Sequence, residues 1–161
     1  MTTKNAQYRN TLLEYFEEEV MGEIYFRELM YNFSRDDERK KLTLLANVER
    51  TTAEILHPII DRYGLIPRSD AELEPLAAQW TEQRKHLNWQ GLMQGMVTEY
   101  PVYVDLFKKF ETQAPQRDIP ALKRLTAHEI ALVDFAKLEI AGNPDSLMPI
   151  HDFLGISFPT E

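Results

Sequence analysis

The chain has 161 residues, 43% of them hydrophobic, and a formal net charge of −8 from 26 acidic and 18 basic side chains. This length suits one domain with a substantial core, and the negative charge disfavours nucleic acid and anionic membrane surfaces as partners. The chain has no cysteine, which excludes thiolate metal sites and cysteine nucleophiles, so any metal would need carboxylate or imidazole ligands. The N-terminus lacks a signal-peptide core and no apolar run could span a bilayer, so we expect a cytoplasmic protein.

Two long helices are predicted in the first part of the chain. Apolar residues recur at helical spacing over residues 7–33. The acidic residues Asp36 and Asp37 then begin a second helix that reaches about Tyr63. The short link between the two predicts an antiparallel hairpin. Pro58 falls inside the second helix and Pro101 inside a later one, where each removes one backbone hydrogen bond and favours a kink unless the helix ends nearby.

A longer connection and two further helices follow. Ser69 and Glu72 have capping-box spacing, which predicts a short helix at about 70–84 inside this connection. A third long helix is predicted at about 86–113 and a fourth at about 119–141. No segment shows strand-like alternation of useful length.

This order of elements predicts an all-α fold. Two antiparallel hairpins joined by a long crossover between helices two and three form a four-helix bundle of the ferritin-like type. We expect one domain over 1–161, with the bundle at about 7–141 and a tail at 142–161. The tail is too apolar to be free, so it should pack on the bundle or on a second subunit. Its apolar residues are Leu147, Met148, Ile150, Phe153, Leu154, Ile156 and Phe158.

The second helix contains a Glu-x-x-His pair, Glu54 and His57, the spacing that di-iron proteins use to bind metal from one helix. At about 100° per residue, however, Glu54 points away from the apolar stripe of this helix and His57 lies at its edge. The carboxylate that falls near the middle of the stripe is Glu49. The pair is therefore interpreted as a solvated face, and Glu49 as a core residue.

Each of the other long helices also has at least one glutamate or histidine that is predicted to face the core. The inward residues are Glu19 and Glu23 on helix one, Glu99 on helix three, and His128 and Glu129 at the border of the stripe on helix four. Glu18 is expected on the outside. Buried carboxylates that converge would repel one another, and a bound metal is the strongest compensation. The alternative is that these glutamates pair with Arg27, Lys109 or tyrosine hydroxyls, or reach water.

The chain resembles the rubrerythrin-like di-iron carboxylate branch of the ferritin-like superfamily over most of residues 7–141. The segments that carry the resemblance are GEIYFRELMYNF (22–33), VERTTAEIL (48–56), TEYPVY (98–103) and AHEIALVDFAKLEIAG (127–142). The resemblance implies metal ligands at Glu23, Glu49, Glu99 and His128, in a site for iron or manganese.

Two departures reduce the ligand set that the resemblance implies. Thr52 stands where the family has a histidine, and Leu125 where it has an acid. Glu129 is a candidate substitute for the missing acid. The remaining ligands could bind one metal, bind two weakly, or be the relic of a lost site. A rubredoxin domain needs cysteines that this chain lacks, so an electron donor would be a separate protein.

These patterns lead to two functional hypotheses. The first is an iron or manganese oxidoreductase that acts on peroxide, oxygen or a small organic substrate, with Tyr103 or Thr52 lining the pocket. The second is a metal-free helical bundle that acts as a dimerisation or partner-binding module. We expect a homodimer in either case.

Overall fold

The computed structural model describes residues 2–156, and these form helices and their connections without any strand. The all-α class predicted from the sequence is therefore confirmed. The elements are α1 (Thr3–Leu29), η1 (Met30–Asn32), α2 (Asp36–Arg62), α3 (Asp70–Arg84), α4 (Trp89–Glu99), α5 (Pro101–Gln113), η2 (Gln116–Asp118), α6 (Ile119–Ile140) and α7 (Met148–Leu154). Within this described part of the chain, no helix has the length and hydropathy that a membrane span requires.

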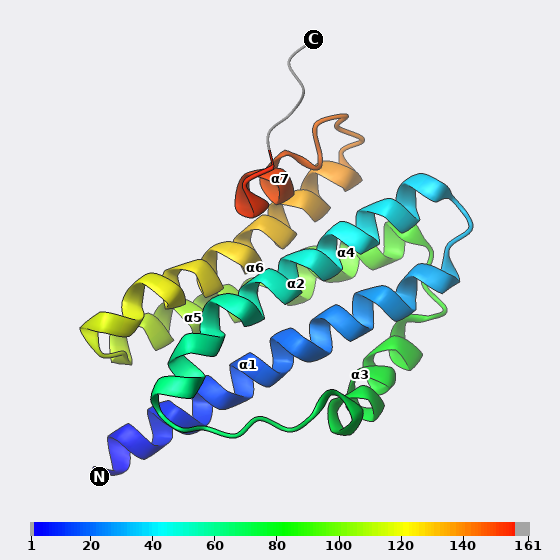
Figure 1. Cartoon of the computed structure of the whole chain (residues 1–161). Coiled ribbons are helices and arrows are strands. Elements are labelled where there is room, and N and C mark those ends of the chain that lie inside the picture. The colour runs from blue at the N-terminus through cyan, green and yellow to red at the C-terminus, as the bar shows by residue number, and fades with distance from the viewer. Residues whose placement is uncertain (1, 157–161) are drawn as a thin grey trace.

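Helices α1 and α2 form the expected antiparallel hairpin and pack along most of their length (Figure 1). The side chain of Thr2 caps the start of α1 by accepting a hydrogen bond from the backbone N–H of Asn5. Acidic residues fill the first turn of α2, where the helix dipole favours negative charge. Pro58 lies inside α2 and does not end it.

The connection after α2 is tied to α1 by a buried acid. The carboxylate of Glu17 accepts a 2.7 Å hydrogen bond from the backbone N–H of Arg68 and pairs with its guanidinium. The next residue, Ser69, begins α3 with both bonds of the predicted capping box to Glu72. Helix α3 then packs along α1, so the connection covers one side of the hairpin (Figure 1).

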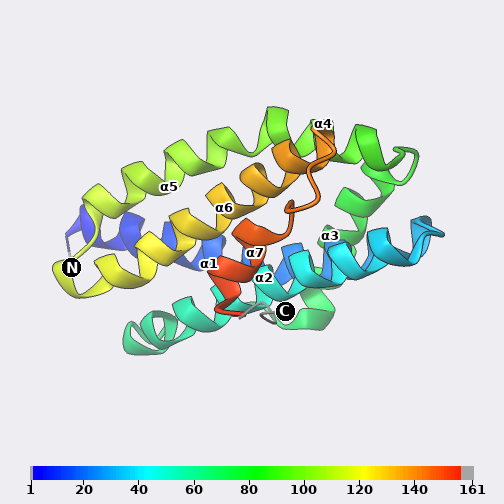
Figure 2. The same cartoon turned by 90° about the horizontal axis from the view of Figure 1, so that it is seen from above.

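The predicted third helix is two helices, α4 and α5. The break falls at Tyr100, because Pro101 has no N–H to donate and occupies the first position of α5. Viewed from above, α4 and α5 follow one another in a bent line and α6 runs back beside them (Figure 2). Both pack against α6.

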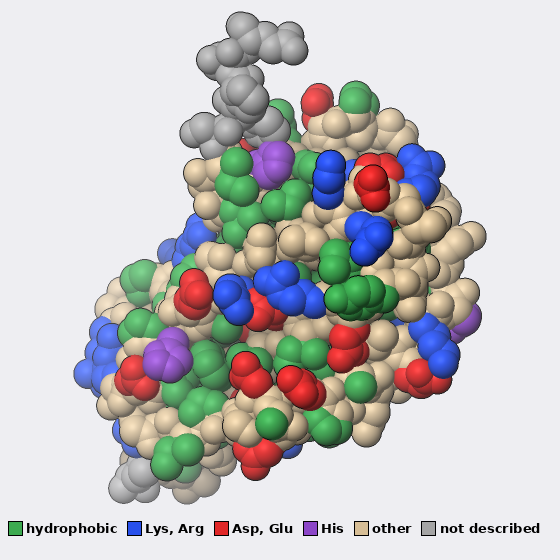
Figure 3. All heavy atoms as spheres, turned by 45° about the vertical axis from the view of Figure 1, so that its right-hand side comes forward, with side chains coloured by type: hydrophobic (Ala, Val, Ile, Leu, Met, Phe, Trp, Pro, Cys, Tyr) green, Lys and Arg blue, Asp and Glu red, His purple; other side chains and the backbone are tan. Residues whose placement is uncertain are grey.

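The C-terminal segment packs on the other helices of the same chain, which is one of the two arrangements predicted from its apolar residues. Helix α7 lies against α6 and α2 (Figure 2) and buries Ile150 and Phe153. It ends at Gly155, whose φ of 69° lies in the left-handed region that glycine adopts without strain. Phe158, also predicted to pack, lies outside the described residues. On the surface shown in Figure 3, acidic and basic side chains are interspersed with hydrophobic ones.

The buried side chains form two main apolar clusters with a polar layer between them. One cluster includes Phe26, Leu45 and Leu132, and the other includes Phe16 and Leu56. Along each of α1, α2 and α6, buried polar residues fall between the positions that belong to one cluster and those that belong to the other. This polar layer is the candidate functional site.

Candidate metal centre

Four buried polar side chains from three helices meet in this layer. Glu19 comes from α1, Glu49 from α2, and His128 and Glu129 from α6. The Nε2 atom of His128 lies 2.9 Å from Oε2 of Glu19 and 3.3 Å from Oε2 of Glu129. The same nitrogen is 3.7 Å from Oε2 of Glu49. The relative exposure of these residues is 0% for His128 and at most 7% for the three glutamates.

The histidine presents a lone pair to the acids. Its Nδ1 atom contacts the backbone carbonyl oxygen of Leu125, an acceptor, so Nδ1 carries the proton and donates it there. In the neutral ring, Nε2 is then an unprotonated acceptor. Among the described residues, neither Nε2 of His128 nor Oε2 of Glu19 has a hydrogen-bond partner, although the two atoms are close. Acceptors that face acceptors in a buried site need a proton or a cation between them.

Burial changes the acidity of the cluster. Desolvation raises the pKa of Glu19 to about 8 and that of Glu129 to about 8, and it raises the pKa of Glu49 well above its usual value. The neighbouring carboxylates add to the rise through like-charge repulsion. Without a cation, the site therefore holds protons at neutral pH. A metal ion could replace those protons and compensate the negative charge.

One atom from each of Glu19, Glu49 and His128 can be chosen so that all three lie within 4.8 Å of one another. That separation allows one ion to contact all three ligands. The carboxylate of Glu129 lies beside the same nitrogen and offers a fourth ligand. Three oxygen donors and one imidazole suit iron or manganese, and the donor set lacks the thiolates that would favour softer metals.

A glycine on α1 allows the two hairpin carboxylates to meet. A Cβ atom added at Gly22 would lie 2.8 Å from both Cδ and Oε2 of Glu49. Real Cβ atoms do not approach other atoms so closely, so the carboxyl group of Glu49 occupies space that only glycine leaves open. This position lies one helical turn after Glu19, on the same face of α1.

A cavity of about 680 Å³ reaches the acid cluster. Its lining includes Glu18, Glu19, Glu49 and Glu129 together with Tyr25, Phe26, Trp80, Tyr100, Tyr103, Leu106 and Phe107. The prediction that Glu18 lies on the outside is wrong, because this side chain is half-buried and lines the cavity, where burial raises its pKa to about 7. Tyr103 lines the cavity as expected, whereas Thr52 is bonded back to the carbonyl of Val48.

Aromatic rings cover the histidine on its other sides. The ring of Phe107 from α5 lies 5.9 Å from the His128 ring, and that of Phe153 from α7 lies 6.3 Å away. The C-terminal helix thus contributes to the wall around the site. Its apolar contact keeps the imidazole away from solvent water, which strengthens the electrostatic interactions of the cluster.

Three of the five residues predicted as metal ligands, Glu49, His128 and Glu129, come together. Glu23 does not join them, although the sequence placed it in the apolar stripe. Its carboxylate lies 2.7 Å from Nε of Arg50 and 3.3 Å from Nη2 of Arg27, in an ion pair at the edge of the α1–α2 interface. Glu23 lies one helical turn beyond Glu19 on a similar face of α1, where Arg50 and Arg27 are within reach of its carboxylate.

Glu99 also lies outside the cluster. It is the last residue of α4, and its carboxylate pairs with Nη2 of Arg84 at 3.0 Å. The side chain is 52% exposed. The sequence predicted a helix over about 86–113 with a kink or an end at Pro101, and the structure has two helices that meet at Tyr100.

The structure also shows where four further residues lie, two from the Glu-x-x-His pair and two that replace expected ligands. Glu54 and His57 are exposed, and His57 lies 3.2 Å from Asp61, so the interpretation as a solvated face is confirmed. Thr52 and Leu125, which replace ligands of the resembled family, are fully buried. Glu19 was recognised as inward-facing but was not among the predicted ligands, and the glycine one turn later is the signal that could have selected it over Glu23.

Comparisons of the chain with protein-family models, with curated proteins and with solved structures give no match.

Proposed function

We propose that this chain is a metal-binding protein of the ferritin-like type, which holds iron or manganese at Glu19, Glu49, His128 and Glu129. The observation that carries the proposal is the buried lone pair of His128 Nε2, which faces three carboxylates that can donate a hydrogen bond to it only after they have bound protons. A hydrogen-bonded structural cluster would place donors against acceptors. A cation satisfies all four groups at once.

The arrangement of helices supports the ferritin-like part of this proposal. The hairpin of α1 and α2 contributes one carboxylate from each helix, and α6 adds the imidazole and a third carboxylate. Helix α3 lies in the connection between α2 and α4, where a ferritin-like bundle has its crossover. Binding sites in such bundles are built from side chains of facing helices, as here.

The cavity supports a role in oxidation or reduction. Iron or manganese, when bound, supplies electron-transfer chemistry on peroxide, oxygen or a small organic substrate. The cavity gives such molecules access to the acid cluster between walls of tyrosine and phenylalanine side chains. Loss of contact with water raises the pKa of Tyr100, a half-buried residue in the cavity lining, well above its usual value, and Tyr25, Glu129 and Glu49 add to the rise, so the hydroxyl stays protonated beside the cluster. Electrons would come from a separate protein.

Metal analysis tests the proposal directly. Protein purified without added metal should contain iron or manganese, or take up ferrous iron stoichiometrically in air. Glu19→Gln should abolish this uptake, because it removes a ligand while keeping the shape of the side chain. Glu23→Gln is the matched control on the same helix and should leave the uptake unchanged, since Glu23 lies in an ion pair with Arg50.

Two results would contradict the proposal. Clearly substoichiometric metal after iron and manganese have both been offered would favour the metal-free module. Loss of metal in Glu23→Gln with normal uptake in Glu19→Gln would instead favour the ligand set that the sequence resemblance implies.

A further inference from the structure

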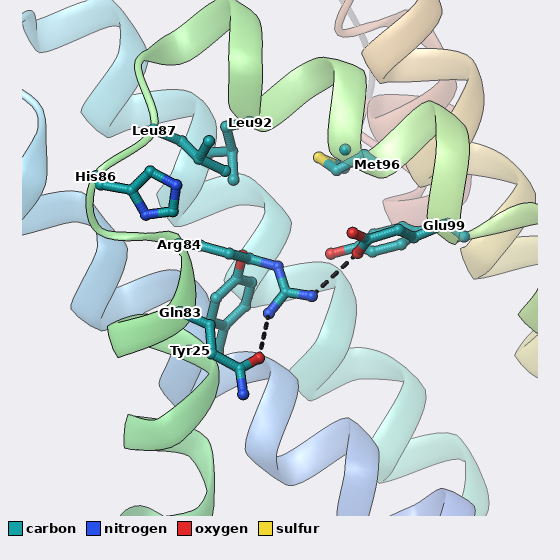
Figure 4. Close-up of a pocket in the computed structure, with 10 residues that line it drawn as sticks. Tyr25, Gln83, Arg84, His86, Leu87, Leu92, Met96 and Glu99 are labelled. Carbon is teal, nitrogen blue, oxygen red and sulfur yellow. Dashed lines mark hydrogen bonds and ion pairs between the residues drawn. The ribbon is translucent and has the colours of Figure 1, made fainter.

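The cavity has one basic side chain, Arg84, in a lining that is otherwise acidic or uncharged. Five glutamates line its wall, and Arg84 at the end of α3 is the single Lys or Arg in the lining that the described residues provide. This guanidinium also lines a second, smaller pocket of about 320 Å³, together with Tyr25, Glu99 and Tyr100 (Figure 4). Arg84 thus lies where the two spaces adjoin.

The hydrogen-bonding capacity of this guanidinium is largely unused. Within residues 2–156, its one close hydrogen bond runs from Nη2 to Oε2 of Glu99, at 3.0 Å. The remaining contacts, from Nη1 to the carbonyl of Trp80 and the side chain of Gln83, are long, at 3.4 Å and 3.5 Å. A guanidinium has five donors in a planar fork that matches a carboxylate with two parallel bonds. Glu99 accepts one close hydrogen bond from these five donors.

Glu99 is a weakly held partner. Its carboxylate is 52% exposed and can return to water at little cost. It stands at the C-terminus of α4, where the helix dipole disfavours a negative charge. Figure 4 shows the Arg84 side chain extended toward Glu99, with Tyr25 beside it. The guanidinium carbon lies 5.8 Å from the centre of that ring, which holds the head group at the cavity wall.

We infer that Arg84 is the recognition group for a small organic carboxylate that enters the cavity and displaces Glu99. The carboxylate would bind the guanidinium fork, and the rest of the molecule would lie against apolar and aromatic walls, which include Trp80, Leu106 and Phe107. The ligand class is therefore a monocarboxylic acid with an aliphatic or aromatic body. As the substrate class of the metal centre this inference rests on the proposed function, whereas the binding step needs only Arg84 and the cavity.

Calorimetric titration with three six-carbon probes tests the ligand class. Hexanoate, 1-hexanol and hexylamine share an apolar chain and differ in the charge of the head group. Measured on chelator-treated protein, hexanoate should bind about tenfold or more tightly than 1-hexanol. Tighter binding of hexylamine than of hexanoate would overturn the inference, because the acids and not Arg84 would then select the ligand.

Three variants identify the residue responsible. Arg84→Gln should weaken hexanoate binding about tenfold and leave 1-hexanol binding unchanged. Glu99→Gln should tighten hexanoate binding, since the competing carboxylate is gone, and a folding defect could not produce that gain. Arg50→Gln is the matched control, because Arg50 also pairs with a glutamate but lies away from the cavity. Unchanged hexanoate affinity in both Arg84→Gln and Glu99→Gln would overturn the inference.

Metal content measured on the same samples separates the two proposals. Hexanoate binding that depends on Arg84 in protein unable to take up metal would support the ligand class and contradict the metal centre. Normal metal uptake without any hexanoate binding to either the chelated or the loaded protein would overturn the ligand class and leave the metal centre standing.

Discussion

Two buried acidic sites in this molecule have opposite surroundings. At one end of the helices, Asp118 is fully buried and accepts hydrogen bonds from the hydroxyl groups of Tyr8 at 2.9 Å and Tyr63 at 2.6 Å. Nη1 of Arg62 donates a third bond at 2.5 Å. In the middle, the carboxylates of the candidate metal centre face one another and the lone pair of His128.

This difference distinguishes a structural acid from a candidate ligand. Asp118 joins α1, α2 and the start of α6 through donors that the protein itself supplies, so it needs no further partner. Asp118 faces hydrogen-bond donors, whereas the central carboxylates face other acceptors. A proton or a metal ion from outside must therefore lie between them. The five predictions below test this contrast, beginning with the largest expected effect.

Removal of the Asp118 carboxylate should be strongly destabilising. In Asp118→Ala the two tyrosine hydroxyl groups lose their buried acceptor, while Arg62, which is 37% exposed, can still reach water. We expect the free energy of unfolding to fall by about 3 kcal/mol, with or without metal. Urea denaturation followed by circular dichroism measures this change. A loss that appears only in metal-loaded protein would contradict the structural role.

The central acids should make the metal-free protein less stable at high pH. Their folded pKa values, about 8 for Glu19 and Glu129, exceed the ordinary value of 4.5, so the folded state binds more protons than the unfolded state between these limits. The free energy of unfolding should therefore fall as the pH rises from 4.5 to about 8. Metal should reverse this trend, because its ligands must be deprotonated. Thermal melts in chelator and in manganese measure both slopes, and equal slopes would refute the metal centre.

Glu49→Gln should act with opposite signs in the two states. The amide keeps the shape of the side chain and removes a buried charge, so metal-free protein should be unchanged or stabilised by about 1 kcal/mol. With metal present, the variant lacks a ligand and should lose most of the metal-dependent rise in melting temperature. Glu23→Gln serves as the control and should not alter that rise. A variant that melts higher than the parent in both buffers would favour the metal-free module.

Alanine at Gly22 should disturb the contact between α1 and Glu49. Alanine in a helix interior is favoured over glycine by about 1 kcal/mol, and Gly95→Ala should show this gain because nothing lies within 4 Å of its added Cβ. Gly22→Ala should instead destabilise by about 1 kcal/mol and weaken metal binding about tenfold, since Glu49 must move. Equal stabilisation by both substitutions would show that the close approach is absent.

The smallest effect is expected for the sequence motif on the exposed face of α2. The double variant Glu54→Ala with His57→Ala should change the free energy of unfolding by about 0.5 kcal/mol and leave metal content unchanged. The variant removes the His57–Asp61 contact, in which both side chains are exposed to solvent. Metal loss in this variant, measured by elemental analysis, would place the ligands on the other face of the helix.

Helical phase alone predicted part of the site. It placed Glu49 and Glu19 in the core and excluded Glu54, because these positions depend only on the periodicity of one helix. It failed at Glu18, which lines a cavity that forms only when α5 packs beside α1. It also failed at Glu99, which was placed in the apolar stripe of the third helix but is exposed and paired with Arg84.

The sequence by itself determined the helices, their order and the inward direction of Glu19 and Glu49, because apolar periodicity and capping are local properties. Ser69 with Glu72, and Pro101 at the start of α5, are local in this sense. Only the tertiary structure decided which of the inward acids meet. Glu23 pairs with Arg50 across the hairpin while Glu19 reaches His128, more than a hundred residues later in the chain. Such contacts depend on how the helices pack, and the sequence of a single helix does not specify which residues of other helices it will contact.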